Sequence, residues 1–230
     1  MSKFSDVYVV DGDTLDVEGL GRVRLLNINT PEMNFKTSRA PEPFAIKAAE
    51  FVKKKVSAGV AIEHVGRDRY KRVLANVWVR EASAHNNWVL LDQMLVVNGL
   101  AFQIFESPGP YVQCLMKAEE KARKQGLGVW SQPDYWLNSA KSGFVIWRAP
   151  VADVEYSGSM VWLVLDESRR LGVRKALISS DDLMSVKGKS LESRGWAVRK
   201  RSSFGAQFLL YPKTKQGVNF GEKNSSRTLD

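Results

Sequence analysis

Residues able to hydrolyse a phosphate ester are concentrated near the start of the chain. Asp11 and Asp13 flank a glycine, and Arg24, Asn29 and Glu32 follow within nine residues of one another. Carboxylate and amide oxygens bind hard divalent cations, a carboxylate can take a proton from water, and a guanidinium can bind an anionic oxygen. Together these groups suit metal-assisted hydrolysis of a phosphate ester.

Short strands are expected to position these side chains. Residues 4–10 and 14–17 read as strands, and Gly12 is expected to supply a positive φ to the tight turn between them. Residues 22–28 read as one further strand. Alternation along it places Arg24 on the face opposite Val23, so that Arg24 can face a cleft.

The elements that follow complete a small β-rich domain. Helices are expected over 41–56, 88–98 and 111–125, and strands over 60–65 and 73–79 around a basic turn at 67–72. Five strands and three helices in this order predict a mainly β fold with α, a small closed barrel packed by helices.

The chain divides into four segments by pattern and charge. We expect a domain over 1–137, a linker over 138–142, a second small β-rich domain over 143–213 and a disordered tail over 214–230. Of the net charge of +9, residues 1–137 contribute +2 and the remainder +7. A basic surface favours a polyanionic partner, most often nucleic acid, although a merely soluble basic protein is the alternative.

Composition limits the possible settings of the protein. The 230 residues are 44% hydrophobic, contain one cysteine and show no apolar run long enough to cross a membrane. The N-terminus lacks the pattern of a secretory signal. We therefore expect a cytoplasmic protein with no membrane partner, while export by another route stays open.

Residues 1–137 resemble the staphylococcal nuclease family, whose fold is an OB-fold barrel with helices. The motifs occur in family order and with family spacing, and any one of them alone would be a weak signal. They are Asp11-Gly12-Asp13-Thr14, Arg24-Leu25-Leu26, Asn29-Thr30-Pro31-Glu32, Asp68-Arg69-Tyr70-Lys71-Arg72, Gly99-Leu100-Ala101 and Gly128-Val129-Trp130.

The resemblance implies a Ca²⁺-dependent phosphodiesterase acting on DNA and RNA. By position, Asp13, the Asn29 side chain and the Thr30 carbonyl would hold the metal. Glu32 would activate water. The phosphate would be bound by Arg24 and Arg72, and the nucleotide's terminal phosphate by Arg69 and Tyr70.

Two positions depart from the family pattern. Asn29 replaces the usual aspartate, which predicts weaker Ca²⁺ binding or a different divalent ion. Lys71 replaces a glycine before Arg72, which would tighten phosphate contact or crowd the turn. Arg24 could instead form a surface salt bridge, and Glu32 could be an ordinary turn carboxylate.

The second domain weakly resembles the OB-like domain appended to some bacterial thermonuclease-like proteins, which implies a nucleic-acid anchor with single strands preferred. For the chain as a whole, the alternatives to a nuclease are a non-catalytic nucleic-acid-binding scaffold with a degenerate metal site at Asn29 and a protein-interaction module. Candidate anchor residues are Trp147, Trp162, Trp196, Arg169, Arg170, Arg174, Arg199 and Arg201, although each tryptophan taken singly favours core packing.

Overall fold

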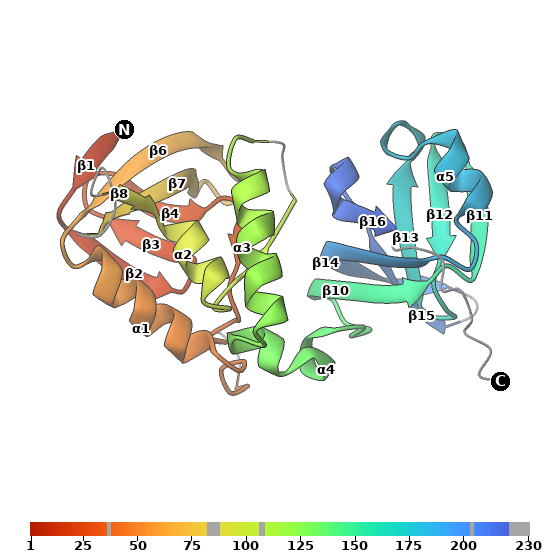
Figure 1. The fold of residues 1–230 in the computed structure, drawn as a ribbon, viewed down its shortest axis with the longest axis horizontal. Helices are drawn as coiled ribbons and strands as arrows, with labels where there is room; N and C mark the ends of the chain where they lie inside the picture. The colour runs from red at the N-terminus through yellow and green to blue at the C-terminus, as the bar shows by residue number, and fades with distance from the viewer. Residues whose placement is uncertain (36–37, 82–87, 106–108, 203–204, 221–230) are drawn as a thin grey trace. The chain divides into compact units, whose positions relative to one another are not determined.

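The computed structural model describes the chain apart from residues 36–37, 82–87, 106–108, 203–204 and 221–230. It divides the chain into two compact units. The first comprises Met1–Ile104 and Gly109–Gln132, and the second comprises Phe105–Pro108 and Pro133–Asp230. Both units are built mainly from strands, with a few helices in addition (Figure 1), as the sequence predicts.

A curled seven-stranded sheet forms the first unit, in the order β1-β6-β7-β4-β3-β2 with β8 paired to β7. A parallel pairing of β4 with β7 joins the two halves of this sheet. The strands are β1 Ser2–Phe4, β2 Val7–Asp11, β3 Thr14–Val17, β4 Gly21–Leu25, β6 Val60–Arg67, β7 Val73–Arg80 and β8 Trp88–Leu90.

Three helices cover this sheet. Helix α1, Ala45–Val56, packs along β2, while α2, Leu91–Val97, and α3, Val112–Lys124, lie side by side (Figure 1). Apolar residues recur on one face of α1 at helical spacing, so Ala45, Ala48 and Val52 are buried there. The short elements η1, Gly128–Ser131, and α4, Pro133–Trp136, follow α3 in the chain.

Two predicted elements of the first unit are divided in the structure. The predicted helix over 88–98 begins only at Leu91, because β8 pairs with the available edge of β7. The predicted strand over 22–28 ends at Leu25 and resumes as β5, Ile28–Asn29, which pairs with β9, Phe102–Gln103. The intervening turn brings the carbonyl oxygens of Leu25 and Ile28 onto the guanidinium of Arg24.

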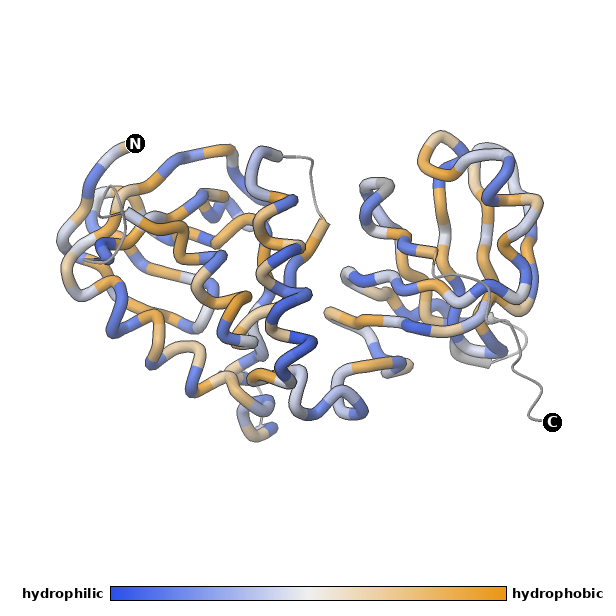
Figure 2. The backbone as a smooth tube through the Cα atoms, viewed as in Figure 1, coloured by the Kyte–Doolittle hydropathy of each residue, from blue (hydrophilic) through white to orange (hydrophobic). Residues whose placement is uncertain are grey.

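A second seven-stranded sheet, in the order β10-β14-β15-β13-β12-β11 with β16 paired to β14, forms the second unit. Apolar and polar residues alternate along its strands (Figure 2), which directs one set of side chains into a separate core. Its elements are β10 Gly143–Pro150, β11 Asp153–Ser157, β12 Met160–Val164, β13 Arg169–Arg174, η2 Lys175–Leu177, α5 Ser180–Ser185, β14 Ser190–Ser202, β15 Gly205–Leu210, η3 Lys215–Gly217 and β16 Val218–Phe220.

The predicted linker and tail differ from the structure. In the linker region, the Asn138 backbone N–H donates to the Ile146 carbonyl at 2.8 Å, so this segment is bonded to β10. In the predicted tail, Val218 is 8% exposed and packs in the second core as part of β16. Ordered structure therefore continues to Phe220, and the rest of the predicted tail lies outside the described residues.

Among the helices that the structure describes, none is both long enough and apolar enough to span a bilayer.

Candidate active site

The turn between β2 and β3 is held against Thr30 by a close backbone approach. A Cβ atom on Gly12 would lie 2.8 Å from Cγ2 and Oγ1 of Thr30 and 2.8 Å from Cβ of Ala48. Gly12 is not among the residues with positive φ, so the expected reason for this glycine was wrong. Its lack of a side chain lets the turn approach Thr30, and Oδ2 of Asp13 then accepts the Thr30 N–H at 2.9 Å.

Arg24 is buried behind this turn, with 7% of its surface exposed. Its Nη2 lies 3.0 Å from Oδ2 of Asp13 and donates to Oδ1 of Asn29 at 3.1 Å. Its Nη1 donates to the Ile28 carbonyl at 2.8 Å and also to the Leu25 carbonyl. The alternative of a surface salt bridge is therefore wrong, because this guanidinium organises a buried network.

Asn29 has only one amide orientation that satisfies its neighbours. Its Oδ1 accepts from Arg24, and its Nδ2 donates to the Thr30 carbonyl at 3.1 Å. The reverse orientation would place two donors together at Arg24 and two acceptors together at Thr30. The Asn29 amide therefore bridges the Arg24 guanidinium and the Thr30 carbonyl. A carboxylate at this position has no N–H to donate to that carbonyl.

The predicted metal ligands fit a divalent cation only in part. Asp13 and the adjacent Asp11 provide carboxylates, and burial together with the charge of Asp13 raises the pKa of Asp11 to about 6. That excess of negative charge suits a cation. However, Asn29 Oδ1 and the Thr30 carbonyl already accept hydrogen bonds, and the described residues contain no group of three or more His, Cys, Asp or Glu side chains at metal-binding spacing.

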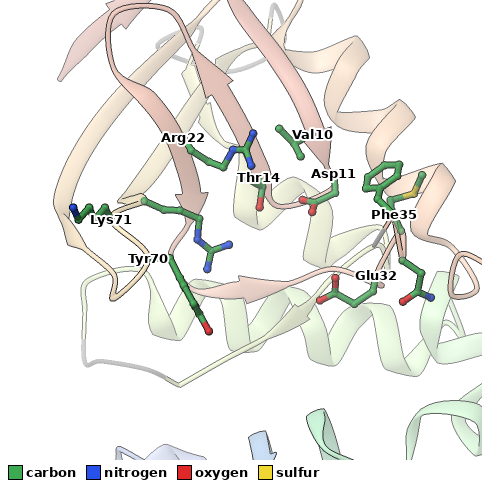
Figure 3. A pocket seen from close by; sticks show the side chains of 11 residues that line it. Val10, Asp11, Thr14, Arg22, Glu32, Phe35, Tyr70 and Lys71 are labelled. Atoms are coloured by element: carbon green, nitrogen blue, oxygen red, sulfur yellow. The ribbon is translucent and has the colours of Figure 1, made fainter. Parts of the chain in front are cut away.

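A cavity of about 810 Å³ lies in front of the network. Figure 3 shows Asp11 and Glu32 directed into it from one side, with Tyr70 and Lys71 on the other. Of the predicted catalytic residues, Glu32 and Arg72 line this space, whereas Arg24 does not. The predicted ligands Asp13, Asn29 and Thr30 also lie outside its lining, which comprises Val10, Asp11, Thr14, Arg22, Glu32, Met33, Asn34, Phe35, Tyr70, Lys71 and Arg72.

Glu32 has the properties of a base that works near neutral pH. Partial burial in the cavity, followed by the charges of Asp13, Asp11 and Glu42, raises its pKa to about 7, against the lowering effect of Arg24. Its backbone N–H donates to Oε2 of Glu42 at 2.9 Å, and the Glu42 N–H donates back to the Glu32 carbonyl at 2.9 Å. This pair of bonds fixes the backbone from which the Glu32 carboxylate projects.

Asp68 holds Arg72 at the opposite wall. Its Oδ2 accepts from Nε of Arg72 at 2.7 Å, and its Oδ1 accepts the N–H groups of Tyr70 and Arg72 at 2.8 and 2.9 Å. Burial alone would raise the pKa of Asp68, but the hydrogen bonds and charge of Arg72 outweigh it and lower the pKa. Neither Nη of Arg72 forms a hydrogen bond to a described residue, so both can bind an anion in the cavity.

Lys71 adopts a left-handed backbone, with φ of 65°. Its N–H donates to the Asp68 carbonyl at 3.0 Å, and its own carbonyl accepts from Nη1 of Arg67 at 2.9 Å. Glycine adopts this conformation without strain, whereas a side chain crowds it. The lysine therefore crowds the turn, one of the two consequences expected from the sequence, and its side chain also lines the cavity.

Arg69 and Tyr70 contact each other at the edge of the site. Nη2 of Arg69 donates to the Tyr70 hydroxyl at 2.6 Å, and its guanidinium lies 4.7 Å from the ring centroid. Tyr70 is 65% exposed and lines the cavity, whereas Arg69 does not. The structure thus joins the two predicted substrate-binding residues but brings only the tyrosine to the cavity.

Sequence reasoning missed Asp92, which lies in the first turn of α2 and is 0% exposed. Burial raises its pKa to about 7, although the nearby backbone amide of Asn27 and the charge of Arg24 lower it. Among the residues that the structure describes, neither carboxylate oxygen of Asp92 has a hydrogen-bond partner. An aspartate beside Leu91 in an otherwise apolar helix start is the signal that could have identified this buried acid.

Comparison with known proteins relates the first unit to a family of nucleases. Residues 22–132 match the family described as Staphylococcal nuclease homologue. The chain is 31% identical over 145 residues to the SPbeta prophage-derived endonuclease YokF of Bacillus subtilis strain 168, a match that covers 59% of this chain and 46% of that protein.

Two further relatives carry similar names. Endonuclease YncB of Bacillus subtilis strain 168 is 30% identical over 145 residues, covering 59% of this chain and 65% of that protein. An uncharacterized endonuclease of Escherichia coli is 29% identical over 134 residues, covering 56% of this chain and 76% of that protein. The matches thus span about half to two thirds of the length of the two Bacillus relatives. Residues 22–132 are thus similar to the staphylococcal nuclease homologues, and the match covers slightly less than half of the chain.

Proposed function

We propose that the first unit is a metal-dependent phosphodiesterase that hydrolyses DNA or RNA. The observation that carries the proposal is the cavity in which Glu32, with its pKa raised to about 7, faces the same space as Arg72 with both Nη atoms unbonded to described residues. The match of residues 22–132 to the staphylococcal nuclease homologues and the endonuclease names of three relatives support it.

Glu32 and Arg72 would divide the chemistry between them. The Glu32 carboxylate takes a proton from the attacking water, and a pKa near neutrality suits it to accept and release that proton. The Nη groups of Arg72 bind the phosphate and stabilise the charge that grows on its oxygens. Tyr70, with Arg69 behind it, contacts the nucleotide at the edge of the cavity.

Arg24 would act from behind the cavity. In the present contacts it holds Asp13 and Asn29 in place and supplies positive charge to an acidic site. Direct contact with a phosphate would require it to exchange one of these internal bonds. We therefore assign it to the catalytic set with a positioning role in the substrate-free protein.

A divalent cation, Ca²⁺ or another ion, would be held by Asp13 with the Asn29 and Thr30 oxygens. Bound there, it would supply charge neutralisation at the phosphate. Oδ1 of Asn29 and the Thr30 carbonyl oxygen each already accept one hydrogen bond, which leaves one lone pair on each oxygen for a cation. Because the Asn29 amide also carries no charge, we expect weaker cation binding than an aspartate would provide, which would also restrain the enzyme in its host.

The second unit would anchor nucleic acid, preferentially single strands, because residues 138–230 contribute +7 of the net charge. A second candidate function is a nucleic-acid-binding scaffold without catalysis. The neutral amide of Asn29 favours this second candidate, since it supplies no charge for a cation and its oxygen already accepts a hydrogen bond from Arg24.

Digestion of labelled single- and double-stranded DNA and RNA, with Ca²⁺, other divalent ions or chelator, tests the proposal. Wild type should cut in a cation-dependent manner, and Glu32→Ala should lose about 10²–10⁴-fold in rate. Glu18→Ala, which removes an exposed carboxylate elsewhere in the unit, should cut as wild type does. Salt-sensitive binding without cutting under any cation would instead favour the scaffold.

A further inference from the structure

Four aromatic side chains form a transverse row on the outer face of the second sheet. Phe144 of β10 is paired with Trp196 of β14, and their ring centroids are 5.6 Å apart. Trp162 of β12 and Tyr211, directly after β15, also lie 5.6 Å apart in an edge-to-face arrangement. We name these four residues the aromatic row.

Strand alternation explains why the aromatic row faces outward. The neighbours Val161 and Leu163 on β12 and Ala197 on β14 are buried in the core of the second unit. Residues between them must point the other way. Trp196 is accordingly 41% exposed and Tyr211 is 45% exposed, and no member of the row belongs to that core.

Gly172 of β13 provides the floor beneath half of the row. It is paired with Trp162 across the sheet. A Cβ atom at this position would lie 2.8 Å from Cζ3 of Trp162 and 2.9 Å from Cε1 of Tyr211. The two rings therefore pack over the glycine backbone, where any larger side chain would displace them.

Charge on the same face favours an anionic occupant. The acidic residues there are each engaged by a cation: Glu155 by Arg170, Asp153 by Lys187, and Glu192 by Arg148 and Arg194. In contrast, Arg174 and Lys200 are exposed and form no ion pair with any residue that the structure describes. Unneutralised cations thus flank an exposed aromatic surface.

From this arrangement we infer that the aromatic row is a docking surface for single-stranded nucleic acid. Unpaired bases stack on Trp196 and Tyr211, while Arg174 and Lys200 contact the phosphates. Unpaired bases expose the ring faces that aromatic side chains stack against, whereas the faces in a duplex are occupied. The inference rests on the proposed function, which it deepens by assigning the anchoring role to one face of one sheet.

The aromatic row differs from the anchor expected from sequence. Trp147 is 0% exposed, and its Nε1 donates to the Ser139 carbonyl, so it belongs to the core. Arg169 is paired with Asp166, and Arg170 is paired with Glu155. Trp162, Trp196 and Arg174 of the predicted set lie on this face, together with Phe144 and Tyr211. Arg199 and Arg201 are exposed, but they alternate with Lys200 along β14 and so point to its other face.

Fluorescence anisotropy of a labelled oligothymidylate on the full chain, in chelator to prevent cutting, tests the inference. Trp196→Ala and Tyr211→Ala should each weaken binding about tenfold, and Trp196→Phe should retain most of it because a ring remains. Arg174→Ala should weaken binding and lower the slope of log K against log salt by about one. Tyr156→Ala, which removes an exposed aromatic outside the row, is the matched control and should bind as wild type does.

Two results would overturn the inference. One is unchanged binding in both Trp196→Ala and Tyr211→Ala. The other is an equal loss of binding to dextran sulfate, a polyanion without bases, since that would mean the rings do not contact bases. If wild type binds a labelled apolar peptide but not the oligonucleotide, and the row variants lose the peptide, the inference is likewise overturned and the surface serves a protein.

Cleavage of the small ester bis(4-nitrophenyl) phosphate separates this inference from the proposed function. The row variants should cleave it as wild type does, because it is too small to reach beyond the catalytic cavity. Loss of oligothymidylate binding in the row variants, together with no cleavage by wild type, would reject the enzyme and retain the docking surface. Cleavage by wild type, together with unchanged oligothymidylate binding in the row variants, would retain the enzyme and reject the docking surface.

Discussion

Nη2 of Arg24 donates to Oδ1 of Asn29 at 3.1 Å while it lies 3.0 Å from Oδ2 of Asp13. One buried nitrogen therefore contacts two of the three groups expected to bind a metal. The third, the Thr30 carbonyl, accepts from the Asn29 amide. The site is consequently satisfied by internal hydrogen bonds, and this determines how a change at Asn29 should behave.

Asn29→Asp should make the stability of the first unit depend on a bound divalent cation. Without cation, the new carboxylate places an oxygen against the Thr30 carbonyl in place of a donor, which should lower the free energy of unfolding by ~1–3 kcal/mol. Added Ca²⁺ should restore the loss by bridging the two oxygens. Thermal unfolding with and without Ca²⁺ measures this effect. Asn98→Asp, at an exposed position, is the control, and an equal Ca²⁺ response in both variants would contradict the prediction.

The rate of cleavage should follow the ionisation of Glu32. A general base acts in its deprotonated form, so the rate should rise as pH passes through about 7, the pKa to which burial and neighbouring carboxylates raise Glu32. Asp11→Asn removes one of the charges that raise this pKa, and it should move the profile to lower pH. Asp16→Asn, at an exposed acid paired with Arg22, should leave the profile in place. A pH profile of kcat/KM that is identical in all three proteins would exclude this electrostatic coupling.

Lys71→Gly should stabilise the first unit by up to ~1 kcal/mol, because it removes a side chain from a backbone with φ of 65°. Urea unfolding measures the change. Lys71→Ala removes the same charge but keeps a Cβ atom, so it should give no such gain. If glycine and alanine change the stability equally, strain at this turn is not the cause.

Asp92 should make stability depend on pH. Because its pKa is raised from 3.8 to about 7, the folded protein binds more protons than the unfolded chain between those values. The contribution of Asp92 to the free energy of unfolding should therefore be fully present below about pH 4. It should be lost as pH rises through about 7, and the loss should be on the order of a few kcal/mol.

The variant Asp92→Asn isolates this contribution, since an amide of the same shape cannot ionise. Chemical unfolding across pH should show the difference between variant and wild type growing between acid and neutral pH, with the variant more stable at the alkaline end. Asp134→Asn, in the exposed first turn of α4, is the control and should follow wild type. A constant difference across pH would show that Asp92 does not titrate in the folded protein.

Much of the fold was accessible from the sequence because its signals are local. Alternation located β3 and β7, and helical spacing of apolar residues located α1 and α3. The division of residues 22–28 into β4 and β5 was not accessible, because it depends on the Arg24 guanidinium meeting carbonyls that only the folded turn brings near.

The sequence supplied candidate residues for the site but not their arrangement. Motif order proposes Arg24, Glu32 and Arg72 as catalytic residues, and nothing in a linear sequence could show that the first is buried while the other two line a cavity. In the same way, the sequence around Gly12 does not show why a glycine is needed there. The reason is the close approach of its backbone to Thr30, not a positive φ. Such features arise from contacts between distant segments.

Single-turnover cleavage of labelled single-stranded DNA by wild type and Glu32→Gln tests whether Glu32 takes the proton from the attacking water. With saturating protein and Ca²⁺, binding is complete in both, so the rate reports the chemical step alone. Wild type should cut, and Glu32→Gln should cut about 10²–10⁴-fold more slowly. Equal rates, or no cutting by wild type that binds the DNA fully, would contradict this role of Glu32.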